Sequence, residues 1–211
     1  MQLLGFHHLT AVTANASGNL SFYTQTLGLR LVKKTVNQDD TSSYHLFYAD
    51  GKATPGTDIT FFDWPTKPER RGNRSVVRTG FRVASADSLK FWSTRLRDAG
   101  LKTSGITSRD DRPTLDFEDP EGQRLSLVVD DPASSANPWN KSPVPAEHQI
   151  HGLGPITISV PELPPTESIL TDLMQMKRVR EYLASPSDGT PGSTAAFVFQ
   201  MSPGGPSTEL H

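Results

Sequence analysis

An order of one strand, one helix and three further strands recurs along this chain and limits the folds that it can adopt. The first occurrence spans residues 1–66. Its helix is indicated by Leu20, Tyr23 and Leu27, which share one helical face, and Gly28 is a typical end for it. The expected elements of this unit are a strand at 5–13, a helix at 15–28, and strands at 29–36, 43–49 and 58–62.

The same order returns in residues 75–131 and again from residue 148 onward. The Gly-Leu pair that ends the first helix at Gly28 recurs at Gly100, about 72 residues later. A recurrence at this spacing indicates a duplicated supersecondary unit rather than a solenoid, whose repeats are shorter. The expected elements of the third unit are a strand at 155–160, a helix at 166–176, and strands at 178–184, 195–201 and 207–211.

This repeat predicts an α+β fold built from tandem βαβββ modules. We expect two modules, 1–66 and 75–131, to form an N-terminal domain over 1–131. Residues 132–147 lack periodicity and are rich in Pro, Ser and Asn, which is typical of a linker. Residues 148–211 then form a third module, the first half of an incomplete C-terminal domain.

Composition excludes several kinds of site. The chain has no cysteine, so disulfides, thiolate metal sites and cysteine nucleophiles are excluded, and any metal must be bound by histidine and carboxylate. A net charge of -2 with mixed signs gives no reason to expect nucleic acid or an anionic membrane as partner. No apolar run approaches the roughly 20 residues of a membrane span, and no secretory signal begins the sequence. We therefore expect a cytoplasmic protein.

Two adjacent histidines, His7 and His8, stand at the start of the first expected strand. Successive side chains on a strand point to opposite faces, so only one of the two can face a given site. Neutral imidazole is the commonest metal ligand in proteins. The pair is a candidate for a metal site, although an isolated His-His dipeptide is more often a surface or core feature.

The repeat and its motifs resemble the vicinal oxygen chelate superfamily, which includes glyoxalase I, bleomycin-resistance proteins and extradiol dioxygenases. Within it the chain most resembles the hydroquinone-type ring-cleaving dioxygenases. The resemblance implies curled mixed sheets around a cavity. The motifs that carry it are Gly5-Phe6-His7-His8-Leu9-Thr10, the run 28–37, Tyr44-His45-Leu46-Phe47-Tyr48-Ala49-Asp50, and Thr54-Pro55-Gly56-Thr57 before Ile59-Thr60-Phe61-Phe62.

That resemblance implies a mononuclear Fe(II), or Mn(II), held by two histidines and one glutamate. It assigns the first metal ligand to His8, and it makes His7 a catalytic neighbour that supports this ligand or contacts substrate. The remaining histidine and the glutamate come from a fourth unit in the family, whereas this sequence shows three. We therefore expect the chain alone to be inactive.

The superfamily that the chain resembles tends to draw a carboxylate ligand from the last strand of a unit. Glu209 lies on the last expected strand with His211 two residues on, facing the same way, so Glu209 is a candidate carboxylate ligand, with a frayed terminus as the commoner alternative. His45 is expected to be hydrogen-bonded and partly buried rather than a ligand. His148 and His151 are expected to face solvent.

Three functions remain open from the sequence. The first is a ring-cleaving dioxygenase that uses Fe(II) and O₂ on a dihydroxyaromatic substrate. The second is a glyoxalase-type lyase or isomerase, which uses no O₂. The third is a binding module without chemistry. An unpaired third module would leave an open sheet edge, so we also expect a homodimer in which third modules pair.

Overall fold

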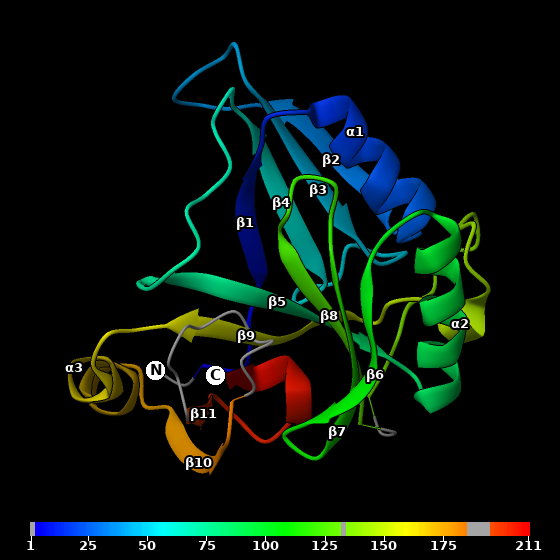
Figure 1. Cartoon of the computed structure of the whole chain (residues 1–211). Coiled ribbons are helices and arrows are strands. Elements are labelled where there is room, and N and C mark those ends of the chain that lie inside the picture. Colours follow the sequence, from blue (N-terminus) through cyan, green and yellow to red (C-terminus); the bar gives the residue numbers. More distant parts are fainter. Residues whose placement is uncertain (1–2, 132–133, 185–194) are drawn as a thin grey trace.

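The computed structural model describes residues 3–131, 134–184 and 195–211, and its elements follow the predicted repeat (Figure 1). The first module has an unusual helix, because α1 (Ala16–Ser21) continues directly into a π-helical turn, η1 (Phe22–Thr26). The side chain of Asn15 caps α1 by accepting a hydrogen bond from the Gly18 amide at 3.0 Å. Its strands are β1 (His8–Thr13), β2 (Arg30–Val36), β3 (Tyr44–Ala49) and β4 (Asp58–Asp63).

The second and third modules repeat this order. The second has β5 (Ser75–Val83), α2 (Ala86–Asp98), β6 (Thr103–Arg109), β7 (Arg112–Glu118) and β8 (Arg124–Val129). A 3₁₀ turn, η2 (Ala146–His148), precedes the third module. The third has β9 (Gly152–Ser159), α3 (Leu163–Ser168), η3 (Ile169–Leu173), β10 (Lys177–Tyr182), β11 (Ala196–Gln200), the 3₁₀ turn η5 (Gly205–Thr208) and β12 (Glu209–Leu210).

The third-module helix begins three residues earlier than the sequence predicted. It starts at Leu163 and takes Pro164 and Pro165 into its first turn, where the missing amide hydrogens have no helical partner to lose. The last expected strand, 207–211, is shorter than predicted, because residues 205–208 form a 3₁₀ turn and the strand covers 209–210 alone.

The twelve strands of the described residues form two mixed sheets. The first module makes a four-stranded sheet of order β1-β4-β3-β2, in which β1 runs parallel to β4. The second and third modules share an eight-stranded sheet of order β10-β11-β12-β9-β5-β8-β7-β6, joined where β5 and β9 pair antiparallel. The α+β class with curled mixed sheets is confirmed.

The expectation that the third module lacks a sheet partner is wrong. Its first strand, β9, pairs with β5 from Ser75↔Ser159 to Arg82↔Gly152. Alternating side chains identify a strand and its buried face, but they do not say which other strand it joins. Of the three strands that begin the modules, β5 and β9 pair with each other. In the described part of the chain β1 pairs with no strand of another module, and it lies at one edge of the four-stranded sheet.

The main core lies between the first two modules. Side chains from α1 and η1 pack with α2 and with one face of each sheet, and Tyr23, Trp92 and Phe61 are among the largest that are fully buried. In Figure 1 the two helices lie together on one side of the molecule, while α3 lies at the opposite end. No helix in the described ranges is long and apolar enough to cross a membrane.

Candidate functional site

The side of the four-stranded sheet that faces away from α1, here called the open face, is only partly covered. It carries His8, Thr10 and Val12 from β1, all three exposed. The alternate residues of β1 point toward the core, as strand geometry requires. The neighbouring strands add aromatic and polar side chains to the open face: His45 and Phe47 from β3, and Asp58, Thr60 and Phe62 from β4.

His7 and His8 contact each other through their rings. Their Nδ1 atoms are 3.0 Å apart, and the rings meet edge to face. The His7 carbonyl accepts a hydrogen bond of 2.7 Å from the Gly56 amide, which fixes the backbone just before β1. Both side chains are exposed. His8 therefore presents its second ring nitrogen, Nε2, with no hydrogen-bond partner among the described residues.

His45 is hydrogen-bonded and half-buried, as expected. Its Nε2 is 3.0 Å from the Thr60 hydroxyl, which itself donates to the Thr10 hydroxyl at 3.0 Å. Because Thr60 uses its one proton toward Thr10, His45 Nε2 must be the donor to Thr60. Burial lowers the pKa of His45, and the nearby Lys33 and His8 lower it further.

The aromatic side chains around His45 form a wall on the open face. The His45 ring lies 3.9 Å from the Phe62 ring and 4.1 Å from the Phe47 ring, measured between centroids. Trp64 stacks on Phe62 at 5.2 Å, and the Lys33 ammonium lies 5.2 Å from the Phe47 ring centre. A flat aromatic molecule could pack against these rings.

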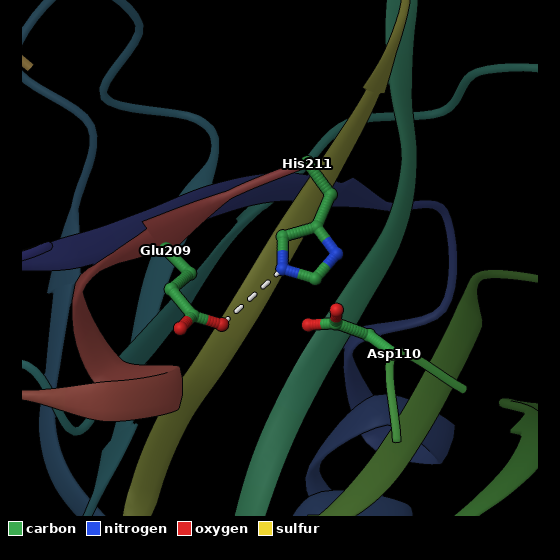
Figure 2. A group of neighbouring side chains, drawn as sticks. All are labelled: Asp110, Glu209 and His211. Carbon is green, nitrogen blue, oxygen red and sulfur yellow. Dashed lines mark hydrogen bonds and ion pairs between the residues drawn. The ribbon is translucent and has the colours of Figure 1, made fainter. Parts of the chain in front are cut away.

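A second candidate site lies on the eight-stranded sheet. Asp110, in the turn between β6 and β7, meets Glu209 and His211 at the chain's C-terminal strand, and their potential ligand atoms lie within 4.8 Å of one another (Figure 2). His211 Nε2 is 3.3 Å from a Glu209 carboxylate oxygen, and His211 Nδ1 is 3.0 Å from the Tyr182 hydroxyl. The prediction that Glu209 and His211 face the same way is therefore confirmed.

Two arginines already occupy the carboxylates of this cluster. Arg112 bonds both oxygens of Glu209, at 2.6 and 3.0 Å, and Arg180 bonds Glu209 at 2.9 Å. Arg180 also forms a two-pronged ion pair with Asp110. Burial raises the pKa of Glu209, but His211 and the two arginines outweigh it, so the pKa lies well below its usual range. A metal ion would have to displace these guanidinium groups.

The two sheets also differ at the position of His8. The carbonyls of Thr13 and Val83 accept equivalent hydrogen bonds from Trp64 and Asp130, the residues that follow the last strand of each module. Counting back five residues, His8 corresponds to Arg78. That guanidinium is buried and lies 3.3 Å from Asp116. The eight-stranded sheet therefore carries a cation where the open face carries an imidazole.

Neither site completes an iron centre from described residues alone. Iron of the implied type needs two histidines and one carboxylate. His8 has suitable chemistry and exposure, but the three-ligand group found among the described residues is Asp110, Glu209 and His211, and His8 is not in it. Glu209 lies on the other sheet, so the structure does not bring it together with His8.

The sequence missed the partners of several residues. His148 and His151 were expected to face solvent, and both are half-buried: His148 stacks on Phe91, and His151 lies 3.2 Å from a carboxylate oxygen of Asp130. Arg112 and Arg180 were not singled out, because their role depends on strand pairing between modules. Besides Glu209 and His211, the adjacent acidic pair at 110–111 was a local signal near that cluster.

Known proteins share both the sequence pattern and the fold of this chain. Residues 5–127 match the family model of the glyoxalase/bleomycin resistance protein/dioxygenase superfamily. The chain is 38% identical over its whole length to "Putative ring-cleaving dioxygenase MhqA" of Bacillus subtilis, of which it covers 66%. It is 27% identical over 82% of its length to chlorohydroquinone/hydroquinone 1,2-dioxygenase of Sphingobium indicum, of which it covers 55%.

Solved structures of related proteins have the same fold as this chain. A crystal structure of a "putative dioxygenase" from Bacillus subtilis superposes with a TM-score of 0.85 at 29% identity, covering 99% of this chain and 63% of the other. Glyoxalase I from Zea mays shares the fold, with a TM-score of 0.69 at 13% identity over 98% of this chain and 66% of the other. The chain spans between 55% and 66% of the length of the curated relatives. The chain belongs to the glyoxalase/bleomycin resistance protein/dioxygenase superfamily.

Proposed function

We propose that this chain carries part of a metal-dependent, ring-cleaving dioxygenase that acts on a dihydroxyaromatic substrate of the hydroquinone type, with His8 as a metal ligand. The relatives named for ring cleavage supply the reaction class. The observation that carries the assignment to His8 is its place on the open face, where an exposed imidazole stands near a wall of aromatic rings.

The open face offers groups that suit such a substrate. Phe47 and Phe62 give flat apolar surface against which a ring can stack, and Lys33 adds a positive charge at its edge. The hydrogen-bonded series from His45 through Thr60 to Thr10 fixes the side chains between β3 and β1. These residues would orient the substrate and keep water away from one side of it.

His7 supports His8 in this proposal. A ligating histidine usually hydrogen-bonds through its other ring nitrogen, which fixes the ring and the tautomer. The 3.0 Å contact between the two Nδ1 atoms gives His8 such a partner. His7 therefore acts through His8, whether or not it also touches substrate.

The metal expected from the resemblance is Fe(II), or Mn(II), which would supply the positions at which substrate and O₂ meet. Within the described residues His8 would hold it, and the other two ligands of the two-histidine, one-glutamate set have no counterpart beside His8. We therefore expect no turnover from this chain by itself.

Equilibrium dialysis against Fe(II) under anaerobic conditions tests the proposal. The parent chain should bind Fe(II) only weakly, because His8 lacks the other two ligands beside it, and His8→Ala should lose that weak binding. His148→Ala, which changes a half-buried histidine outside the open face, should bind like the parent. If His8→Ala binds as well as the parent, the assignment of His8 is wrong. O₂ uptake with hydroquinone should stay at the buffer rate, and uptake above it would contradict the expected inactivity.

A homodimer remains part of the proposal, with a different interface from the one first expected. The third module is already paired through β9, whereas β1 is an edge strand beside the open face among the residues that the structure describes. Val12 of β1 and Trp64, which stacks on Phe62, are 42% and 36% exposed on this side of the first module. A second copy that covered them would bury apolar surface. Sedimentation showing a monomer at micromolar concentration would contradict this interface.

A further inference from the structure

The strands that join the second and third modules, β5 and β9, can be aligned with β1, because each is the first strand of its module. Val83 of β5 accepts the hydrogen bond that Thr13 accepts in β1, and it lies 70 residues later. The π-helical turn that begins at Phe22 in the first module begins at Ile169 in the third, 147 residues later. Each residue of β5 and β9 therefore has an equivalent number in the first module.

In these first-module numbers, the pairing of β5 with β9 is symmetric. Thr79 lies opposite Ile156, and both correspond to residue 9. A pairing that is symmetric about one position can also be made by two identical strands related by a two-fold axis. On either side of this centre the pairs mirror one another: Ser75↔Ser159 and Arg82↔Gly152 are 5↔12 and 12↔5, and Val76↔Ile158 and Phe81↔Leu153 are 6↔11 and 11↔6.

β1 has the backbone groups that this pairing requires. It is an edge strand among the residues that the structure describes. The carbonyls of His7 and Thr13 accept hydrogen bonds from the residues that flank β4. Because backbone groups alternate in direction along a strand, those of residues 8, 10 and 12 point to the other edge. An edge strand with such outward groups is a template for another strand.

We propose that two copies of this chain pair β1 with β1, antiparallel and with Leu9 opposite Leu9 on a two-fold axis, so that the His8 residues of both copies lie in one shared site. In this register His8 of one copy lies opposite Thr10 of the other. The equivalent residues in the chain, Arg78 and Thr157, are register partners and line one cavity. The metal part of this inference rests on the proposed function, whereas the strand pairing concerns the metal-free chain.

The proposed register brings the two His8 side chains within reach of one ion. They are diagonal neighbours on the same face of the paired strands, where Cα atoms are about 7–8 Å apart. That separation is close to the ~6.6 Å between alternate residues along one strand. The ligand set expected for this family needs two histidines and one carboxylate, and the second copy supplies the second histidine. We therefore expect one metal ion for every two chains.

Single-cysteine variants test the register, because the chain has no cysteine of its own. Leu9 directs its backbone groups toward β4, so two Leu9 residues would form a non-hydrogen-bonded pair, with Cα atoms about 4.5 Å apart. This distance suits a disulfide. Under mild oxidation the disulfide-linked fraction of Leu9→Cys should therefore exceed that of Ala11→Cys by at least about tenfold.

Ala11→Cys is the matched control, because Ala11 lies on the same face of β1, also partly buried against the core, but opposite position 6 in the proposed register. Its two copies would be too far apart for a disulfide. Circular dichroism shows whether each variant is folded. Equal cross-linking of the two variants, or none from a folded Leu9→Cys chain, would overturn the pairing.

A backbone variant tests the same pairing without cysteine. Thr10→Pro removes an amide that would bond the His8 carbonyl of the other copy, twice in each dimer. The dimer dissociation constant from sedimentation should rise by about tenfold or more, whereas Thr10→Ser, which keeps the amide, should dimerise like the parent. An unchanged constant in folded Thr10→Pro would contradict the β1 interface.

Co(II) titration of the disulfide-linked Leu9→Cys dimer tests the shared site. One ion for every two chains, lost in the Leu9→Cys, His8→Ala double variant, is the expected result. Two ions for every two chains would overturn the sharing of the site. Failure of the proposed function is distinguishable, because metal binding that survives loss of His8 would refute the assignment of His8 while the cross-link still supported the pairing.

Discussion

The helices of the first and third modules have nearly the same backbone and very different surroundings. In both, a six-residue α-helix continues into a π-helical turn, and matching hydrogen bonds close it: Leu27 N to Phe22 O at 2.9 Å, and Met174 N to Ile169 O at 3.0 Å. Yet Phe22 and Leu27 are 4% and 1% exposed, whereas Ile169 and Met174 are 54% and 37% exposed.

The two helices differ in exposure because only the first is covered by α2. In the first module α2 packs on the helix, and Arg95 reaches across to the carbonyls of Gln25 and Thr26 at 2.6 and 2.8 Å. In the described residues no helix does the same for η3, and Leu173 is 77% exposed. The helical turn is therefore encoded locally by the module, while its burial depends on a neighbouring module.

The largest expected effect on stability comes from removing a buried apolar side chain of the first-module helix. Phe22→Ala should lower the free energy of unfolding by about 3–5 kcal/mol, because it leaves a cavity in the core. Ile169→Ala, at the equivalent position of the third module, should cost less than about 1 kcal/mol. Urea unfolding of both variants measures the contrast, and equal losses would mean that the two helices are covered to the same degree.

A smaller effect is expected where the second and third modules meet at Glu209. Glu209→Gln should cost about 2–3 kcal/mol at neutral pH, since Arg112 and Arg180 lose their buried acceptor but keep some solvent contact. The folded pKa of Glu209 is depressed, so its stabilisation is present above the usual carboxyl pKa and is lost as pH falls below it.

Urea unfolding of the parent and Glu209→Gln at neutral and acidic pH measures this dependence. From about pH 5 downward the parent should lose more stability than Glu209→Gln, and the two curves should converge. Parallel curves would show that the carboxylate adds nothing to folding, and the ion pairs would then not join the modules.

The smallest effect is expected at the residue that ends each helix. Gly28 has φ +73°, and a Cβ there would lie 2.6 Å from both Ser142 Oγ and Val144 Cγ2, so Gly28→Ala should cost about 2 kcal/mol. Gln175 occupies the same left-handed region at φ +58°. Gln175→Gly should therefore raise stability slightly, by less than about 1 kcal/mol. Thermal unfolding compares the two, and a destabilising Gln175→Gly would contradict the equivalence.

The helices and strands of each module could be predicted from the sequence, but the pairing of strands between modules could not. The apolar stripe of Leu20, Tyr23 and Leu27, and its recurrence in α2, marked the helices because periodicity is a local property. The pairing of β5 with β9 could not be predicted from either strand, since the residues of a strand do not say which other strand lies beside it. The same limit applied to Glu209, whose position was predicted but whose guanidinium partners come from two other strands.

The assignment of the metal to His8 on the open face, rather than to the cluster at Glu209, can be tested by a metal titration. Co(II) is added stepwise to the chain while NMR follows the ring signals of its six histidines. We expect the His8 ring signals to shift at the lowest Co(II) concentration and those of His211, beside the arginine-paired Glu209, to shift only later. If His211 shifts first and His8 does not respond, the metal site lies on the eight-stranded sheet and the assignment to His8 is wrong.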